Sequence, residues 1–268
     1  MSGYGARFGG IERLFGREGS RRLRQAHVCV IGIGGVGSWS VEALARSGVG
    51  TLTLVDLDEV CISNTNRQLH AVQGEYGMSK VEVMARRVHS INPDCVVHPV
   101  QSFFTPGTAD ALLSTPYDCL LDAIDRPAQK CLLLARARQL GRFIVVTGGA
   151  GGRRDPCQIR TADLAYSTHD ALLQEVRRSL RRDYGFPRGR MPFGVTAVFS
   201  TEPQVFPTTE GGVCDRRAPE QDLRLDCESG YGTAAFVTGA FGLTAAAVAV
   251  RGIVSGQEIS PPRRHEER

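Results

Sequence analysis

A glycine-rich segment, Gly32-Ile33-Gly34-Gly35-Val36-Gly37, constrains the fold of this 268-residue chain more than any other feature. It follows an apolar run, His27 to Ile31, which is typical of a buried parallel strand, and it opens a stretch of helical spacing, Val36 to Ser47. Glycines in this context let the backbone turn tightly and approach a phosphate, whose charge the helix N-terminus favours. The turn therefore predicts a nucleotide site, with the candidate binding residues Gly32, Gly34, Gly35 and Gly37.

Strand-like and helical segments alternate after this turn. The expected strands are Thr51 to Val55, Cys95 to Val100, Tyr117 to Leu121 and Phe143 to Thr147, and the expected helices include Met78 to Ile91 and Ala128 to Leu140. Such alternation predicts an α/β fold with a doubly wound, mostly parallel, Rossmann-like sheet. Ligands of such sheets bind in the crevice at the carboxyl ends of the strands.

The pattern changes after Thr147. A glycine loop, Gly148 to Gly152, precedes further expected elements: strands at Gln158 to Asp163, Val195 to Ser200 and Gln204 to Phe206, which would be added to the sheet, and a helix at Ala171 to Arg182. An arginine-rich helix, Glu12 to Gln25, is expected at the start. We predict a single domain over residues 1–253, with a nucleotide-binding part at about 27–150, a substrate part at about 151–253 and a disordered tail over 254–268.

Composition limits the compartment and the chemistry. The start of the chain has no apolar stretch of a secretory signal, so we expect a cytoplasmic protein. The eight cysteines form no CxxC pair, which argues against a zinc knuckle, an iron–sulfur site or a disulfide scaffold. Residues 234–250 carry no charge, but this stretch is short and rich in Ala, Gly and Thr, which favours a buried helix over a membrane span. Membrane association through this helix is the weaker alternative.

Polar residues near the predicted crevice select the nucleotide. Asp56 closes the second strand, where a carboxylate can accept hydrogen bonds from ribose hydroxyls. Asn64, Arg67 and Lys80 would supply donors for three phosphates, whereas a dinucleotide has only a pyrophosphate, so ATP is favoured over NAD. Asp125 could hold Mg²⁺, which binds through one or two carboxylates plus phosphates.

Each of these residues also has a structural interpretation. Arg67 could be a surface charge, Asn64 a turn former and Asp125 an N-cap of the following helix. Only two of the 32 Lys and Arg residues are lysines, so a retained lysine indicates a position that needs a compact ammonium. We assign that position to Lys80, and we expect Lys130, in the middle of a helix, to face solvent.

Four stretches over about the first 130 residues resemble the ubiquitin-activating-enzyme-like adenylating superfamily: VIGIGGVGS, LVDLDEVCISNTNRQ, GMSKVEVMARRVHSINP and DAIDR. The resemblance implies that ATP and Mg²⁺ adenylate a carboxylate. By position it implies that Asp56 binds the ribose, that Asn64, Arg67 and Lys80 bind the triphosphate, and that Asp125 is the Mg²⁺-associated acid. Of these, Asp125, Lys80 and Arg67 would be catalytic.

Five further segments resemble the tRNA threonylcarbamoyladenosine dehydratase branch of this superfamily: Arg7 to Gly10, Asn64 to Gln68, Thr147 to Gly152, Phe199 to Glu202 and Asp226 to Gly232. That branch activates the threonyl carboxylate of a modified adenosine beside the anticodon of tRNA and then cyclises it with loss of water. The alternative is an activator of a sulfur-carrier protein's C-terminus. Such activators usually carry two CxxC pairs for zinc, which this chain lacks.

Partners follow from the same comparison. Ring closure within one nucleoside needs no enzymic thiol, but Cys227 or Cys214 could be a nucleophile or a sulfur acceptor, with a cysteine desulfurase system as partner. The superfamily implies a homodimer in which an N-terminal arginine reaches the partner's triphosphate, and Arg13 is the nearest candidate. A basic helix would contact tRNA through Arg177, Arg178, Arg181 and Arg182.

Overall fold

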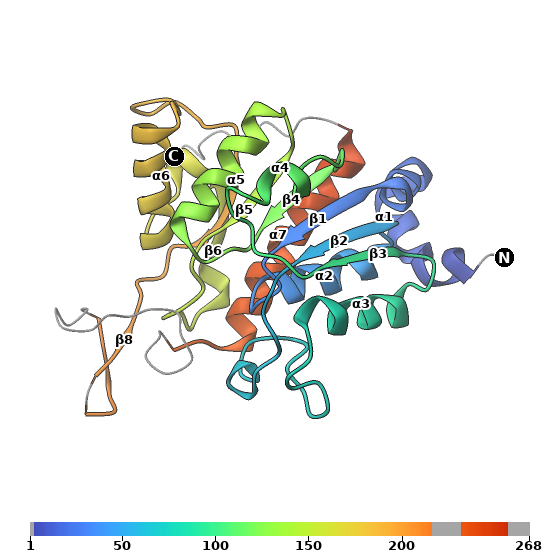
Figure 1. The fold of residues 1–268 in the computed structure, drawn as a ribbon, viewed down its shortest axis with the longest axis horizontal. Helices are drawn as coiled ribbons and strands as arrows, with labels where there is room; N and C mark the ends of the chain where they lie inside the picture. The colour runs from blue at the N-terminus through green and yellow to red at the C-terminus, as the bar shows by residue number, and fades with distance from the viewer. Residues whose placement is uncertain (1–2, 209, 216–231, 257–268) are drawn as a thin grey trace.

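The computed structural model describes residues 3–208, 210–215 and 232–256. Seven strands form one sheet in the order β3-β2-β1-β4-β5-β7-β6 (Figure 1). The strands are β1 (His27–Ile31), β2 (Thr51–Val55), β3 (Val96–Val100), β4 (Cys119–Asp122), β5 (Ile144–Thr147), β6 (Ile159–Asp163) and β7 (Thr196–Ser200). Within this sheet, β6 is antiparallel to its neighbour β7, and the other described strand pairs are parallel. The predicted doubly wound, mostly parallel sheet is confirmed.

Helices cover both faces of the sheet because each buried strand is apolar on both sides. Val28 and Val30 of β1 belong to a core that includes α2 (Gly37–Arg46), α3 (Lys80–Ile91) and α7 (Ala235–Ser255). Cys29 and Ile31 belong to the core on the other face, with α4 (Ala109–Leu112), α5 (Pro127–Gln139) and α6 (Ala171–Asp183). Two hydrophobic cores therefore enclose the central strands.

Strand order reverses at β1, which pairs with β2 on one side and with β4 on the other. Gly32 follows β1 at this point with φ of 91°. A Cβ on Gly32 would lie 2.8 Å from the carbonyl oxygen of Ala123, which follows β4, so the close approach requires glycine. The two turns together form the crevice where ligands of open α/β sheets bind.

The apolar segment predicted at 234–250 is helix α7, which lies against α2 and the sheet. It is long and apolar enough to cross a membrane, yet 67% of its most apolar 18-residue stretch is buried inside the protein. A Cβ on Gly242 would lie 2.7 Å from Cβ of Trp39 on α2, so small residues let the two helices pack closely. Packing within the protein thus accounts for the apolar composition of α7.

The first and last helices extend beyond the sequence-based expectation. Helix α1 (Gly3–Gln25) begins well before Glu12, with a kink at Gly16, because the buried rings of Tyr4 and Phe8 anchor its glycine-rich first half. Helix α7 continues to Ser255, past the predicted boundary at 253, and ends where Gly256 adopts a left-handed conformation. Most of the predicted tail, 257–268, lies outside the described residues.

The strand predicted at Gln204 to Phe206 does not join the main sheet. Its position is taken by β8 (Phe206–Pro207), which pairs instead with β9 (Val213–Cys214) in a separate two-stranded sheet. Pro203 lies between β7 and β8 and has no backbone N–H to donate to a ladder, so the chain leaves the sheet there.

Candidate functional site

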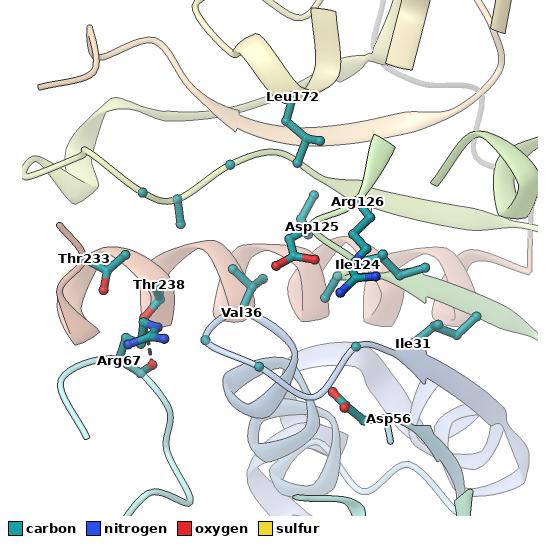
Figure 2. Close-up of a pocket in the computed structure, with 18 of the residues that line it drawn as sticks. Ile31, Val36, Asp56, Arg67, Ile124, Asp125, Arg126, Leu172, Thr233 and Thr238 are labelled. Atoms are coloured by element: carbon teal, nitrogen blue, oxygen red, sulfur yellow. Dashed lines mark hydrogen bonds between the residues drawn. The ribbon is translucent and has the colours of Figure 1, made fainter. Parts of the chain in front are cut away.

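A cavity of about 670 Å³ opens at the carboxyl ends of β1, β4 and β5. Figure 2 shows the glycine turn on one side of it and the segment after β4, with Asp125, on the other. The structure brings many of the predicted residues to its wall: Gly32, Gly34, Gly35, Asp56, Arg67, Asp125 and the glycine loop Gly148 to Gly151.

A backbone hydrogen bond to β2 and the absence of a Cβ shape the glycine turn. The amide of Gly32 donates to the carbonyl of Val55 at 2.9 Å, which fixes the turn to the end of β2. A Cβ on Gly37 would lie 1.8 Å from the carbonyl oxygen of Gly32, so only glycine allows α2 to begin there. Gly37 therefore shapes the turn without lining the cavity, whereas Gly34 and Gly35 line it.

Asp56 is fixed directly beneath this turn. One carboxylate oxygen accepts the amide of Ile33 at 2.6 Å and the other accepts the amide of Asp58 at 2.9 Å. Burial raises the pKa of Asp56, while the nearby Lys80 ammonium and the two amide donors oppose the rise. A carboxylate has about four lone-pair sites, so Asp56 keeps acceptor capacity toward the cavity that it lines.

Arg67 reaches the cavity from the segment between β2 and α3. Its backbone carbonyl accepts hydrogen bonds from Trp39 Nε1 at 3.2 Å and from Thr238 Oγ1 at 3.0 Å, so α2 and α7 both hold this residue. Its guanidinium donates to the carbonyl of Ser63 at 2.7 Å and to Asn66 Oδ1 at 3.0 Å. The cation is therefore ordered beside the cavity without a carboxylate partner in the described part of the chain.

Two predicted phosphate ligands do not line the cavity. Asn64 is buried and accepts the amide of Cys61 at 3.1 Å, which closes the short helix η1 (Ile62–Asn64) in the role of a turn former. Lys80 is the first residue of α3, and its ammonium pairs with Asp58 Oδ2 at 2.9 Å. Lys80 nevertheless lies close enough to Asp56 to affect its pKa.

Asp125 follows β4 and points into the cavity (Figure 2). It is exposed, and within the described ranges its carboxylate has no hydrogen-bond partner. The N-cap position of α5 is occupied by Arg126, without a side-chain capping bond, so Asp125 does not cap that helix. Its carboxylate is free to meet a ligand.

The sequence predicted that Lys130 faces solvent, and the structure shows that this prediction is wrong. Its side chain is 0% exposed, and its ammonium pairs with Asp122 Oδ1 at 3.0 Å. The helical pattern of α5 gives no sign of this burial, because the counter-charge lies on β4 rather than one helical turn away. Burial raises the pKa of Asp122, and the Lys130 ammonium opposes that rise.

Some cavity residues were missed by the sequence reasoning. The segment Ser102 to Thr105 follows β3 and lines the cavity, and the guanidinium of Arg126 lies 5.9 Å from the ring centre of Phe103. The rule that ligands bind at the carboxyl ends of strands could have identified this segment. Thr233 and Thr238, near the start of α7, also line the cavity, and no local motif predicts them.

The arginines of α6 lie outside the cavity lining. Arg177 donates to Ser167 Oγ, Arg181 donates to two backbone carbonyls and stacks on Phe193, and Arg182 pairs with Asp183 at 2.7 Å. Arg178 is exposed, and its side chain makes no hydrogen bond or ion pair with another described residue. Three of the four arginines are therefore held by other groups of the protein, whereas Arg178 is exposed to solvent.

The remaining candidates are also separate from the cavity wall. Arg13 is exposed on α1, and Cys214 is partly exposed on β9. Cys227 lies outside the described residues. Among the described residues no group of three or more His, Cys, Asp or Glu side chains could hold a metal ion. A magnesium ion needs only one or two carboxylates when phosphates supply its other ligands.

A doubly wound sheet with a glycine turn, an acid at the end of its second strand and a cation across the cavity defines a nucleotide-binding protein of the Rossmann-like class. The chain belongs to the ThiF family, whose model matches residues 10–265.

Relatives place it more narrowly within that family. The chain is 45% identical over 247 residues to the tRNA threonylcarbamoyladenosine dehydratase of Escherichia coli, and the matched region covers 91% of this chain and 92% of that protein. It is 47% identical over 247 residues to the enzyme of the same name from Haemophilus influenzae, with the same coverage. The crystal structure of the E. coli enzyme TcdA in complex with ATP matches this chain with a TM-score of 0.85 and 40% identity. The match covers 96% of this chain and 97% of the TcdA chain. The resemblance indicated by the motifs is confirmed.

Proposed function

We propose that this chain catalyses the ATP-dependent dehydration of N6-threonylcarbamoyladenosine beside the anticodon of tRNA. The observation that carries the proposal is one cavity that joins the glycine turn, Asp56, Arg67 and Asp125, in a chain whose relatives are dehydratases of that nucleoside over 91% of its length. The alternative, activation of a sulfur-carrier protein, has less support because the chain lacks CxxC pairs.

The chemistry begins with a poor acyl donor. A carboxylate oxygen of the threonyl group attacks the α-phosphorus of ATP and releases pyrophosphate, so that this oxygen becomes part of AMP. An atom of the same nucleoside then attacks the acyl carbon, and AMP departs with the oxygen. The nucleoside loses one water in total, and ATP becomes AMP and pyrophosphate. The second step is intramolecular and is accelerated by proximity.

The residues of the cavity divide this work. Gly32, Gly34 and Gly35, with the N-terminus of α2, would bind phosphate oxygens, and the Asp56 carboxylate would accept the ribose hydroxyls. Arg67 would neutralise charge on the phosphates. The glycine loop at 148–151 would let the modified nucleoside approach the α-phosphate, since three of its four residues have no side chain.

Lys80 and Asn64 require a further step in this scheme. The Lys80 ammonium would leave Asp58, whose side chain is 54% exposed, and move to the triphosphate, where it meets a higher negative charge. Asn64 would act on the triphosphate through the turn that it closes before Arg67.

A magnesium ion fits the donor set at the cavity. Asp125 offers an exposed carboxylate with no hydrogen-bond partner among the described residues, and hard cations prefer oxygen ligands of this kind. When bound with ATP, the ion would neutralise charge on the phosphates. The Asp125 carboxylate would position the ion so that its positive charge faces the reacting groups in the cavity.

The proposal extends to partners and compartment. Arg177, Arg178, Arg181 and Arg182 would contact the phosphates of tRNA, since they lie on a basic helix whose N-cap, Asp170, accepts the amide of Gly149 in the cavity loop. We propose a cytoplasmic homodimer in which Arg13 of one subunit reaches the other's triphosphate. The unit would be a single domain over residues 1–253, and Cys227 or Cys214 would be the contact for a cysteine desulfurase system if one takes part.

Nucleoside mass spectrometry tests the reaction directly. Purified protein is incubated with tRNA that carries threonylcarbamoyladenosine, with Mg²⁺, in the presence and absence of ATP. Loss of one water only with ATP supports the proposal. Asp125→Ala and Lys80→Ala should abolish product while tRNA binding stays near that of the parent protein. If the nucleoside is unchanged but pyrophosphate is released with a carrier protein's C-terminus, the proposal is wrong.

A further inference from the structure

Lys130 is a fully buried cation directly behind the cavity wall. It lies on α5, and its partner Asp122 is the last residue of β4. Both side chains are 0% exposed, and Nζ lies 3.0 Å from Asp122 Oδ1. Neither residue lines the cavity, but the three residues that follow Asp122 do.

The contacts of this pair converge on one residue of the wall. Lys130 Nζ donates to the carbonyl of Ile124 at 2.7 Å, and the amide of Ile124 donates to Asp122 Oδ1 at 3.0 Å. Both backbone polar groups of Ile124 are therefore held by the buried pair. The next residue is Asp125, whose carboxylate points into the cavity.

Stability does not explain why a chain would keep a charge pair at this place. Removing two charges from water costs free energy that their attraction offsets only with good geometry, and well-packed apolar residues often serve stability as well or better. A compact ammonium can donate to several acceptors at once, whereas the planar guanidinium needs a fork of acceptors. Lys130 is one of only two lysines in a chain rich in arginine.

We propose that Lys130 is a positioning residue: its ammonium, paired with Asp122, holds the backbone of Ile124 so that the Asp125 carboxylate faces the reacting groups in the cavity. The inference rests on the proposed function for what those groups are. The geometry that it invokes exists without any ligand.

The test removes both charges together, because removal of one leaves the other buried without a partner. In Asp122→Asn/Lys130→Met the amide oxygen of Asn can still accept the Ile124 amide, but the carbonyl of Ile124 loses its donor. We expect kcat for dehydration to fall about 100-fold with KM for ATP changed less than about threefold, as for a misplacement of about 1 Å. Glu42→Gln/Arg87→Met removes the 2.7 Å pair between α2 and α3, in which Glu42 is 8% and Arg87 41% exposed and Glu42 also pairs with Arg46. This variant is the control for loss of a charge pair as such and should keep the parent kcat.

Two further measurements separate positioning from a general structural role. In an Asp125→Asn background the double change should lower kcat by no more than about threefold, because residues that act through one another are not additive. Hydrogen exchange of the Ile124 amide, measured without substrate, should be faster in Asp122→Asn/Lys130→Met. It should stay slow in Asp122→Asn alone, where the amine of Lys130, even when it loses its proton for want of a counter-charge, still donates to the carbonyl of Ile124.

The outcomes are distinguishable. If the parent protein fails to dehydrate the nucleoside, the proposed function is wrong, and the exchange data still test the positioning. The inference is overturned if the double variant keeps the parent kcat, or if its effect multiplies fully with that of Asp125→Asn. It is also overturned if Asp122→Asn alone frees the Ile124 amide, which would make the carboxylate and not Lys130 the holding group.

Discussion

Gly148 lies so close to Asp170 that a Cβ at position 148 would be 2.1 Å from the carboxylate Oδ2. That oxygen accepts the amide of Gly149 at 2.9 Å, while Oδ1 accepts the amide of Leu173 and caps α6. One buried carboxylate thus joins the N-terminus of the basic helix to the glycine loop of the cavity. The absence of a side chain at Gly148 is what allows this contact.

Gly148→Ala should therefore destabilise the protein and disturb the loop. The added methyl must displace Asp170, and overpacking of this kind costs about 1–3 kcal/mol. Gly149→Ala is the matched control, because the nearest atom to its new Cβ would be 3.9 Å away. Urea unfolding of both variants measures the difference. Equal stability of the two would show that Asp170 can move without cost.

Asp56 should give the protein a preference for ribonucleotides. If its carboxylate accepts the ribose hydroxyls, the parent should bind ATP more tightly than 2′-deoxy-ATP by roughly tenfold, the value of one hydrogen bond to a charged group. Asp56→Asn should reduce this ratio, and titration calorimetry measures it. The ratio of two affinities does not depend on the fraction of folded protein. A ratio unchanged by the substitution would contradict the assigned role.

Arg178 should contribute to tRNA binding through charge alone. It is exposed and has no partner among the described residues, so Arg178→Glu should weaken tRNA binding and lower the dependence of log Kd on log salt by about one. Arg251→Glu makes the same charge change at an exposed position of α7 and is the control. Equal effects of the two reversals would indicate only a response to net charge.

His70 should make stability depend on pH. It is 2% exposed, and burial together with the Lys80 ammonium lowers its pKa from 6.5 to about 4. The unfolded chain therefore binds a proton at higher pH than the folded protein does. The free energy of unfolding should fall by about 3 kcal/mol as the pH drops from 7 toward 4.

The His70→Gln variant isolates that contribution. Gln does not titrate, so the variant should lose stability less steeply over the same pH range in urea unfolding. His89→Gln, at an exposed position, controls for the loss of a histidine as such. If the parent and His70→Gln show the same pH dependence, the buried imidazole is not the cause.

The central strands were predictable because their signals are local. The bounds of β1 and β2 match the expected segments, His27 to Ile31 and Thr51 to Val55, since each is a short apolar run that polar or glycine residues terminate. Helix α1 was predicted only from Glu12, because the glycine-rich residues before it have low helix propensity. Its first half is stabilised by tertiary contact, such as the 2.6 Å bond from the Tyr4 hydroxyl to the carbonyl of Gly48.

The site was predictable to the extent that strand ends determine it. Asp56 and Asp125 each follow a parallel strand, and the structure places both at the cavity. The side-chain directions of Lys80 and Lys130 depend on partners, Asp58 and Asp122, that lie on other elements, and a periodic pattern carries no information about such partners.

Helix α7 has a consequence for how the protein is made. It packs on α2 and bonds to Arg67 through Thr238, yet it follows the glycine turn by roughly 200 residues, a large separation for contacts that complete one site. A ribosome adds about 5–20 residues per second, so the turn is synthesised roughly 10 to 40 s before the helix that supports it. A nascent chain consequently has no complete nucleotide cavity until nearly all of this sequence has been translated.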